Sequence, residues 1–490
     1  MKKSVAGILV LTIFLITFFS RTLIAFQSDK FSYEAYFSIR QIDNIGSEGV
    51  PLFNDELSYG GRTHLFPPVF YYLVSFFDFL GINNASKIIP NLLSSLLVIV
   101  AYLICFHITR HRTISLFGSF FSGFIPIFFD TTNDVSVYSL VLLLTFFVLY
   151  FLMKVKNRLH LNLALLFLFV IVLSHASVFL LIIGLLLFLL LLKIESLEIN
   201  SKEQEIILFV TFFAMWFNFI IYKKAFLTHG PFVIWQNLPL QMLTNYFFDL
   251  KLFQSIYYLG IIPVVLGMYA IYQVFFKVKK KSVFLLIGLF LSSLLLLWLK
   301  LIEFKVGLIF LGVILSLLSV YSIKLIYSYL NKTKAPKSAN WFLFAVFVLF
   351  LLTSVVPSFN LAYSSLKNIP SDAEIEALRW LKQNTVSDSV VVARVDEGYL
   401  INYFAERKNV LDNDFLLVND AQLRYDNVQS VFSLRLKTEA IRKLSTYDVD
   451  YIYFSGNFGD EKKLYYTDED CFDLVYDEVV KIYWLKCRLE

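Results

Sequence analysis

The chain of 490 residues is rich in apolar side chains: 58% of its residues are hydrophobic, 17% are charged and the mean hydropathy is +0.68. This composition excludes a purely soluble enzyme, and the pattern of the apolar runs excludes coiled-coil and fibrous proteins. Charge is divided unevenly. Residues 361–490 contain 16 Lys and Arg against 23 Asp and Glu, and residues 1–360 contain the other 27 against 15. The sequence therefore predicts a basic membrane part followed by an acidic tail.

Long apolar runs predict an α-helical polytopic membrane protein with about 11 transmembrane helices. A spanning helix needs about 20 apolar residues, and the stretch at 161–193 is divided because polar residues interrupt it at 174–177. The predicted spans are 5–26, 87–108, 113–129, 135–153, 159–173, 176–193, 206–222, 254–276, 282–299, 306–329 and 341–357.

Basic residues gather in alternate loops between these runs, as Arg110 and Arg112 do after the second run. An excess of Lys and Arg in short loops is typical of the cytoplasmic side of a membrane protein. We therefore interpret these residues as an orientation signal and not as a nucleic-acid-binding surface. This alternation of basic loops requires that residues 67–81 do not cross the membrane. Two prolines at the start of this segment and Asp78 within it favour an interfacial or re-entrant helix. An odd number of spans then places the tail outside, with the loops 27–86, 130–134 and 223–253.

The tail, residues 358–490, is expected to form an extracytoplasmic α/β domain beyond a transmembrane domain at 1–357. Ser371 and Glu374 form a capping box that opens a helix through Lys382, and residues 389–394 are typical of a buried strand. Further elements are expected as a turn at 396–398, helices at 399–406 and 438–445, a strand at 450–455 and a terminal hairpin at 471–487. Cys471 and Cys487 flank this hairpin, and spacing alone leaves their pairing open.

The first external loop is a candidate for chemistry because about 40 residues of mostly polar sequence stand between two apolar elements. Ser32 is expected to cap a helix over residues 33–45, whose aromatic side chains rest on the membrane surface. Glu34 would then lie close to the bilayer on an ordered element. We interpret it as a catalytic carboxylate.

A second group of acids lies at Asp130 and Asp134. Carboxylates that share one face with Glu34 would suit a divalent cation such as Mg²⁺ or Mn²⁺, since hard cations prefer oxygen ligands. The alternative is that both aspartates are solvated ends of helices that interact with a helix dipole.

Three basic side chains are candidates for binding a lipid-linked phosphate. Lys305 lies in an outer loop by this topology, against the positive-inside trend, and Arg62 and His64 end the polar part of the first loop. The alternative for Lys305 is that it snorkels to lipid headgroups. The sequence contains no HExxH, CxxC pair, P-loop or GxSxG motif, so it gives no support to zinc hydrolase, redox, ATPase or serine hydrolase activity.

The residues 34–40 (EAYFSIR), 49–52 (GVPL) and 54–62 (NDELSYGGR) resemble the first external loop of the oligosaccharyltransferase catalytic subunit. The resemblance puts Glu34 at the family's metal-binding, catalytic aspartate. Asn133-Asp134 and the residues 138–146 resemble the second acidic motif, with one of its two acids missing.

The tail carries a third match, in residues 380–385, 394–399 and 405–410, to the region around the WWDYG motif that recognises the acceptor. Asp396 and Gly398 of that motif are present. Both tryptophans are replaced, by Arg394 and Val395, and Glu397 replaces the tyrosine.

The resemblance implies a GT-C superfamily glycosyltransferase, similar also to dolichyl-phosphate-mannose-type mannosyltransferases. It would transfer a sugar from a polyprenyl-phosphate-linked donor to a glycan, lipid or protein acceptor on the outer face, with Mg²⁺ or Mn²⁺ as cofactor. Two alternatives stay open. One is a non-catalytic scaffold in cell-surface glycan assembly. The other is a flippase or transporter, which is weakened because the predicted spans contain almost no charged residues.

Overall fold

The computed structural model describes residues 2–58, 61–155, 157–244, 246, 252–277, 279–333, 337–456 and 464–488. The chain forms two compact units. The first comprises Met1–Asp29, Pro67–Ile221 and Tyr246–Lys367, and the second Lys30–Phe66, Tyr222–Asn245 and Asn368–Glu490. The second unit therefore contains the first polar loop as well as the tail, a grouping that differs from a division at residue 357.

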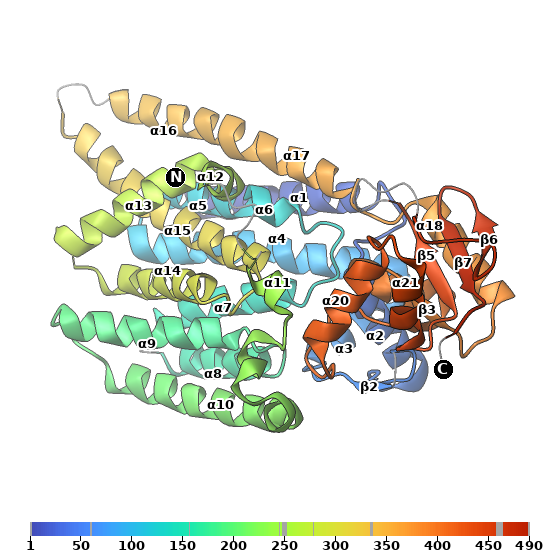
Figure 1. The fold of residues 1–490 in the computed structure, drawn as a ribbon. Coiled ribbons are helices and arrows are strands. Elements are labelled where there is room, and N and C mark those ends of the chain that lie inside the picture. Colours follow the sequence, from blue (N-terminus) through green and yellow to red (C-terminus); the bar gives the residue numbers. More distant parts are fainter. Residues whose placement is uncertain are drawn as a thin grey trace. The chain divides into compact units, whose positions relative to one another are not determined.

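The first unit is a bundle of apolar helices (Figure 1). Its longer helices are α1 (Lys3–Ala25), α4 (Ile82–Thr109), α5 (Arg112–Gly123), α7 (Tyr138–Leu152), α8 (Arg158–Val172), α9 (Val178–Ile194), α10 (Ser201–His229), α13 (Ile261–Phe276), α14 (Lys281–Trp298), α15 (Phe304–Leu330), α16 (Lys337–Phe350) and α17 (Val356–Ser365). The last residues of α10, 222–229, belong to the second unit. The shorter ones are α3 (Val69–Ser75), η1 (Asp78–Leu80), α6 (Pro126–Phe129), α12 (Leu252–Leu259) and the π-helix η4 (Leu351–Val355).

The predicted count of eleven spans is not confirmed. Among the described residues, six helices are long and apolar enough to cross a membrane, and a seventh is reached if α12 and α13, bent by 94° at their junction, make one span. Three shorter apolar helices, α7, α8 and α9, stand where spans were predicted. The predicted span at 113–129 is broken into α5 and α6, and 12 residues of α5 rise only about 18 Å.

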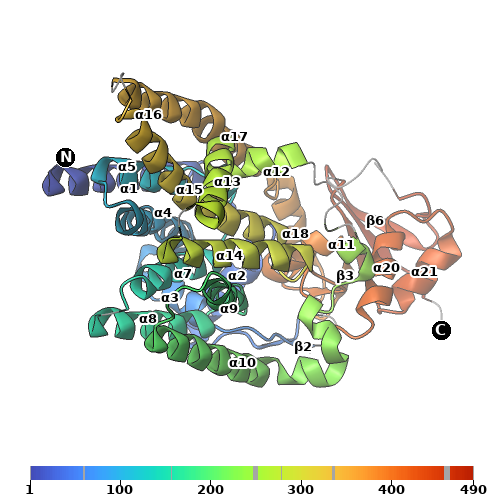
Figure 2. The ribbon, with the colours of Figure 1, turned by 90° about the vertical axis from the view of Figure 1, so that its left-hand side faces the viewer.

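Helix α15 is the centre of this bundle, since the whole of its most apolar window is buried. Figures 1 and 2 show it among neighbouring helices, and it contacts α13, α14, α5 and α4. Glycines let backbones approach closely: a Cβ on Gly288 of α14 would lie 2.5 Å from the carbonyl oxygen of Gly184 in α9. Small residues at helix contacts are the usual means of close packing in a bilayer.

The segment after the first polar loop does not form a spanning helix. Helix α3 follows Pro68 and has only 7 residues, and η1 ends at Gly81 before α4 begins. The prediction that residues 67–81 do not cross as a helix is therefore confirmed.

The second unit is built on a five-stranded sheet with the order β4-β3-β5-β7-β6. The strands are β3 (Val390–Val392), β4 (Lys408–Asn409), β5 (Tyr451–Phe454), β6 (Phe472–Asp477) and β7 (Lys481–Leu485). Strand β3 is parallel to β4 and β5, and β7 is antiparallel to β5 and β6. The described residues thus confirm a small α/β domain in the tail.

Helices of the second unit supply much of its core. They are α2 (Ala35–Glu48), η2 (Gly230–Trp235), α11 (Leu240–Thr244), α18 (Asp372–Asn384), η5 (Val395–Glu397), α19 (Gly398–Leu400), the π-helix η6 (Ile401–Ala405), α20 (Ala421–Val431) and α21 (Lys437–Ser445). Phe415, Ile441, Ile452 and Phe472 are among the buried side chains that pack together. The capping box of Ser371 and Glu374 is present, as predicted.

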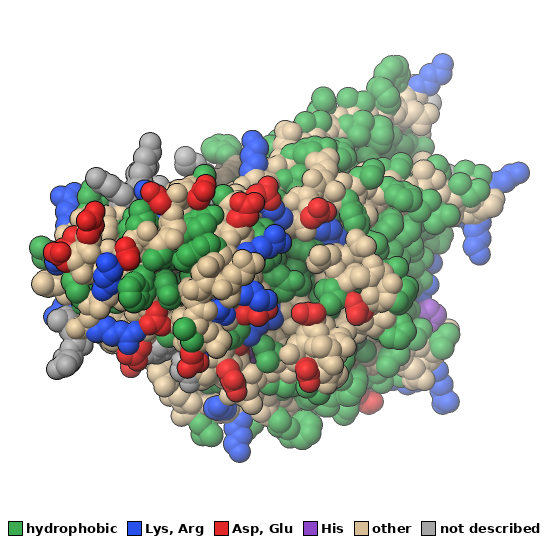
Figure 3. Space-filling model, turned by 90° about the vertical axis from the view of Figure 1, so that its right-hand side faces the viewer, with side chains coloured by type: hydrophobic (Ala, Val, Ile, Leu, Met, Phe, Trp, Pro, Cys, Tyr) green, Lys and Arg blue, Asp and Glu red, His purple; other side chains and the backbone are tan. Residues whose placement is uncertain are grey.

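A disulfide joins Cys471 and Cys487 beside the β6–β7 hairpin, as the spacing allowed, and Cys105 is buried and reduced in α4. Acidic and basic side chains are interspersed on the face shown in Figure 3. The acidic excess of the tail is thus not gathered into one patch on that face.

Candidate functional site

Glu34 is the N-cap residue of α2 in the second unit, and its side chain is exposed. The predicted cap by Ser32 is wrong: α2 begins at Ala35 and no side chain caps it. The prediction that the aromatic side chains of α2 rest on a membrane surface is also wrong. Tyr36 packs against Tyr403 and Phe404 at ring-centroid distances of 5.2 and 4.9 Å. These contacts within the second unit fix the helix on which Glu34 lies.

The acceptor-motif segment, residues 394–399, lies beside this helix, because α19 contacts α2 and the rings of Phe37 and Tyr399 are 5.3 Å apart. Burial raises the pKa of Tyr399 well above its ordinary value, and the charges of Asp412, Asp414 and Glu34 add to this rise. Tyr399 is thus an electrostatic neighbour of Glu34. Sequence reasoning missed it as a site residue, although it directly follows Gly398.

Asp396 and Gly398 have different surroundings. Asp396 is exposed and accepts a hydrogen bond from Asn413 Nδ2 at 3.2 Å. Gly398 is buried, and a Cβ there would lie 2.4 Å from the carbonyl oxygen of Leu411 and 2.6 Å from Cβ of Asp412. A glycine is therefore required at this position by close packing.

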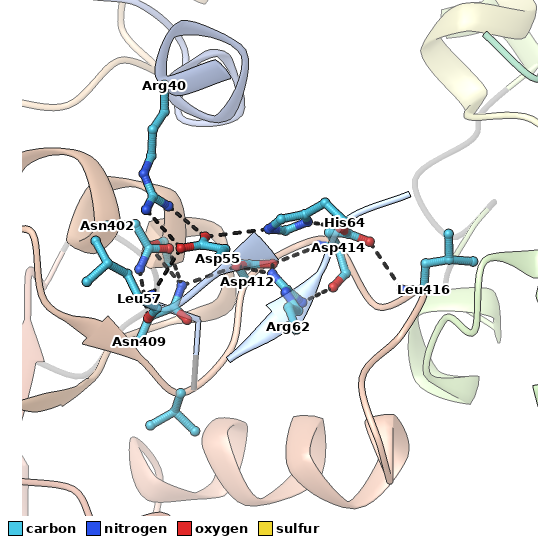
Figure 4. Close-up of polar contacts among 12 residues, drawn as sticks. Arg40, Asp55, Leu57, Arg62, His64, Asn402, Asn409, Asp412, Asp414 and Leu416 are labelled. Atoms are coloured by element: carbon cyan, nitrogen blue, oxygen red, sulfur yellow. Dashed lines mark hydrogen bonds and ion pairs between the residues drawn. The ribbon is translucent and has the colours of Figure 1, made fainter. Parts of the chain in front are cut away.

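Arg40 and His64 of the first loop are held by a shared carboxylate. Arg40 donates two hydrogen bonds to Asp55, at 2.6 and 2.8 Å. Asp55 Oδ2 lies 3.5 Å from Nε2 of His64, whose Nδ1 contacts Asp414 Oδ2 at 2.7 Å (Figure 4). The β1–β2 hairpin, in which β1 (Asn54–Asp55) pairs with β2 (Arg62–Thr63), brings Asp55 and His64 together.

Arg62, like Arg40 and His64, is held by carboxylates. It donates to both carboxylate oxygens of Asp412 and to the carbonyl oxygen of Asp414, and the side chains of Arg62 and Asp412 are 9% and 2% exposed. Asn409 donates to Asp412 at 3.2 Å and to the carbonyl oxygen of Gly398 at 3.0 Å. The network in Figure 4 thus joins the first loop to the acceptor-motif segment within the second unit.

We call this set the loop–tail network: Arg40, Asp55, Arg62, His64, Asp412 and Asp414. Its charges balance when His64 is protonated. Although burial lowers the pKa of His64, the two carboxylates outweigh burial and raise it to about 9. Burial likewise opposes ionisation of Asp55 and Asp414, but His64 and the arginines hold the pKa of each far below its ordinary range. These contacts give Arg62 and His64 a structural role. They occupy most of the hydrogen-bond donors with which either side chain could bind a lipid phosphate.

A second polar cluster lies in the first unit. Nζ of Lys305, at the start of α15, is 2.8 Å from Asp130 Oδ2 and 2.9 Å from Asp134 Oδ2. The three side chains are 22–29% exposed. The structure therefore brings three predicted site residues together, whereas Glu34 belongs to the other unit.

The loop that carries Asp130 and Asp134 is anchored by Arg21, a buried side chain of α1. Arg21 donates to the carbonyl oxygen of Phe128 at 2.6 Å, to Thr131 Oγ1 at 2.9 Å and to Asn91 Oδ1 at 3.0 Å. This contact has no local signal in the sequence, because about a hundred residues separate Arg21 from the loop.

The predicted divalent cation was to be held by Glu34, Asp130 and Asp134. Among the described residues, no group of three or more His, Cys, Asp and Glu side chains is arranged to hold a metal ion. The carboxylate oxygens that would bind Mg²⁺ already contact the ammonium of Lys305, so a cation does not fit on this pair beside the lysine.

Comparisons with known proteins extend these observations to the fold. No family model and no curated protein sequence matches the chain. Solved structures do. Oligosaccharyltransferase from Archaeoglobus fulgidus matches with a TM-score of 0.70 and 13% identity, over 93% of this chain and 70% of that one. ArnT from Cupriavidus metallidurans bound to undecaprenyl phosphate matches with a TM-score of 0.53 and 10% identity, over 98% of each chain.

Two further matches describe the group. Arabinofuranosyltransferase AftD from Mycobacteria matches with a TM-score of 0.57 and 14% identity, over 99% of this chain and 42% of that one. The archaeal oligosaccharyltransferase has also been solved with zinc and sulfate, and with an inhibitory peptide and a dolichol-phosphate. The chain therefore has the fold of GT-C membrane glycosyltransferases, which confirms the predicted resemblance at the level of fold.

Proposed function

We propose that the chain is an integral membrane glycosyltransferase that transfers a sugar from a polyprenyl-phosphate-linked donor to an acceptor on the outer face of the membrane. The fold supports this proposal, because two of the matching structures contain a polyprenyl phosphate. The acceptor is a glycan, lipid or protein.

One observation carries the proposal. Glu34 and the acceptor-motif segment, which are about 360 residues apart in the sequence, belong to one unit, where α2 contacts α19. The loop–tail network joins the first loop, which carries Glu34, to the tail through the ion pair of Arg62 and Asp412. A carboxylate beside a segment that resembles an acceptor-binding motif is the arrangement that group transfer to an acceptor requires.

The proposed reaction is a displacement at the anomeric carbon of the sugar. The bond from this carbon to the phosphate oxygen breaks, a bond from the acceptor to the same carbon forms, and the phosphate leaves with the bonding electrons. Glu34 takes the acceptor proton, and Lys305 neutralises the leaving phosphate. Asp396 and Tyr399 line the acceptor side, and no step needs Arg62 or His64.

Transfer of labelled sugar by the purified chain in detergent, from a panel of polyprenyl phosphate and diphosphate donors, tests the proposal. We expect Glu34→Gln to abolish transfer with unchanged expression and melting temperature. Glu48→Gln is the matched control, since Glu48 is also exposed but ends α2, and it should retain activity. Full activity of Glu34→Gln would remove Glu34 from the mechanism, and no transfer from any donor would favour a non-catalytic scaffold.

A further inference from the structure

The ammonium of Lys305 stands where a metal ion would be expected to stand. Its two contacts, at 2.8 and 2.9 Å, go to one carboxylate oxygen each of Asp130 and Asp134. These are hydrogen-bond distances for a charged donor and a charged acceptor. The lysine thus bridges the pair as a divalent cation does when it shares two carboxylates.

The charges of this cluster oppose the simultaneous presence of the Lys305 ammonium and a divalent metal ion. Lys305 and Arg21, which acts electrostatically on Asp134, supply two positive charges for the carboxylates of Asp130 and Asp134. Glu303, which acts electrostatically on both Lys305 and Asp134, contributes at most one further negative charge. A divalent ion added to this set would leave an excess of at least one positive charge in a partly buried cluster, where Coulomb repulsion is strong. A metal ion can therefore bind the pair only if Lys305 leaves it.

Among the described residues, the lysine also retains a hydrogen-bond donor for a ligand. An ammonium has three N–H groups, and the contacts with Asp130 and Asp134 use two of them. Its side chain is 29% exposed, so the third group can reach a molecule outside the cluster. Beside the aspartates, both polar side-chain atoms of Asn133 are buried and, within the described part of the chain, lack hydrogen-bond partners.

We propose that Lys305 is a built-in cation that replaces a divalent metal on the Asp130–Asp134 pair, and that its remaining N–H group binds the phosphate of the donor. Binding of the phosphate rests on the proposed function, whereas exclusion of metal from the pair does not. Lys305 then performs both tasks that a metal would perform at such a site: it joins the carboxylates and neutralises the leaving group.

Mn²⁺ binding to the full chain in detergent, followed by electron paramagnetic resonance after removal of bound metal with EDTA, tests this proposal without any sugar donor. We expect wild type and Asp134→Asn to bind the same amount of Mn²⁺. Lys305→Met should gain one site, bound at least about tenfold more tightly than any in wild type, since the competing charge is gone. Glu303, two residues before Lys305, is a further source of oxygen ligands for it.

Two controls make the result specific. Asp134→Asn in the Lys305→Met chain should remove the gained site, and Lys332→Met, which deletes an exposed lysine just after α15, should gain none. Mn²⁺ that wild type binds and Asp134→Asn loses would overturn the proposal, and this comparison does not depend on the folding of Lys305→Met. A folded Lys305→Met chain that gains no site would overturn it too.

Transfer assays separate this proposal from the proposed function. If both hold, wild-type transfer keeps its rate in EDTA, and Lys305→Met loses transfer. A chain that transfers no sugar from any donor would remove the proposed function and leave the Mn²⁺ result as it stands.

Discussion

His64 contacts Asp414 through a 2.7 Å interaction between Nδ1 and Oδ2, although 350 residues separate them in the sequence. His64 is 2% exposed, and its second ring nitrogen lies 3.5 Å from Asp55. An imidazole between two carboxylates is held in its protonated form. The loop–tail network is therefore a set of three positive and three negative charges that holds the first loop against the tail within the second unit.

The first prediction concerns pH. The pKa of His64 is raised from 6.5 to about 9, so its stabilisation is fully present below about pH 6.5 and is lost as the pH rises through 9. The full effect is on the order of 3 kcal/mol. We expect the melting temperature of the purified chain, followed by tryptophan fluorescence, to fall between pH 7 and pH 10.

His64→Gln is the reference for this measurement. It should melt at a lower temperature than wild type at pH 6.5, and the difference should shrink toward pH 10. A constant difference over that range would show that His64 is neutral in the folded chain.

The second prediction concerns Arg62. Arg62→Met leaves the buried carboxylate of Asp412 without its partner, which we expect to cost about 3–5 kcal/mol of unfolding free energy. Arg62→Met with Asp412→Leu should recover part of this loss, because no buried charge remains. Lys382→Met is the control: its ion pair with Glu406 is exposed, and its loss should cost at most about 1 kcal/mol.

Activity measurements on the same variants test the structural role of Arg62. Transfer per folded molecule should be retained in the double variant. A double variant that folds as well as wild type but transfers no sugar would instead assign Arg62 to the donor phosphate.

Local elements could be predicted from the sequence because their signals lie within a few residues. The capping box of Ser371 and Glu374 and the β6–β7 hairpin beside Cys471 and Cys487 are of this kind. Capping of α2 by Ser32 failed because the helix begins two residues later than predicted, so that Glu34 becomes the N-cap. Boundaries of helices are decided by differences of this size.

The partners of the site residues could not be predicted, because they come from distant segments. Arg62 and His64 were expected to bind a ligand, and their partners Asp412 and Asp414 lie 350 residues further along the chain. Lys305 and Asp134 were both expected at the site, but 171 residues separate them and their ion pair has no local signal. Composition and motifs identified the chemical groups, whereas tertiary packing decided which groups neutralise each other.

The third prediction concerns Gly398. A methyl group there would meet the backbone of Leu411 and Asp412 at 2.4–2.9 Å, and a backbone cannot move as a flexible side chain can. We expect Gly398→Ala to cost about 2–3 kcal/mol of unfolding free energy. Gly7→Ala in α1 is the control, since nothing lies within 4 Å of a Cβ at that position. Equal melting temperatures for the two variants would contradict this explanation.

The last prediction uses the disulfide between Cys471 and Cys487 to test the proposed orientation of the tail. Disulfides persist in oxidising compartments, so a tail on the outer face keeps this bond, and a cytoplasmic tail would hold two thiols. We expect a membrane-impermeant maleimide to label the cysteines of intact cells only after treatment with an impermeant reductant. Cys105 is buried in α4 and should not react, so Cys471→Ser with Cys487→Ser is the blank. Labelling that requires lysis of the cells, with or without the reductant, would place the tail in the cytoplasm and reverse the topology deduced from the basic loops.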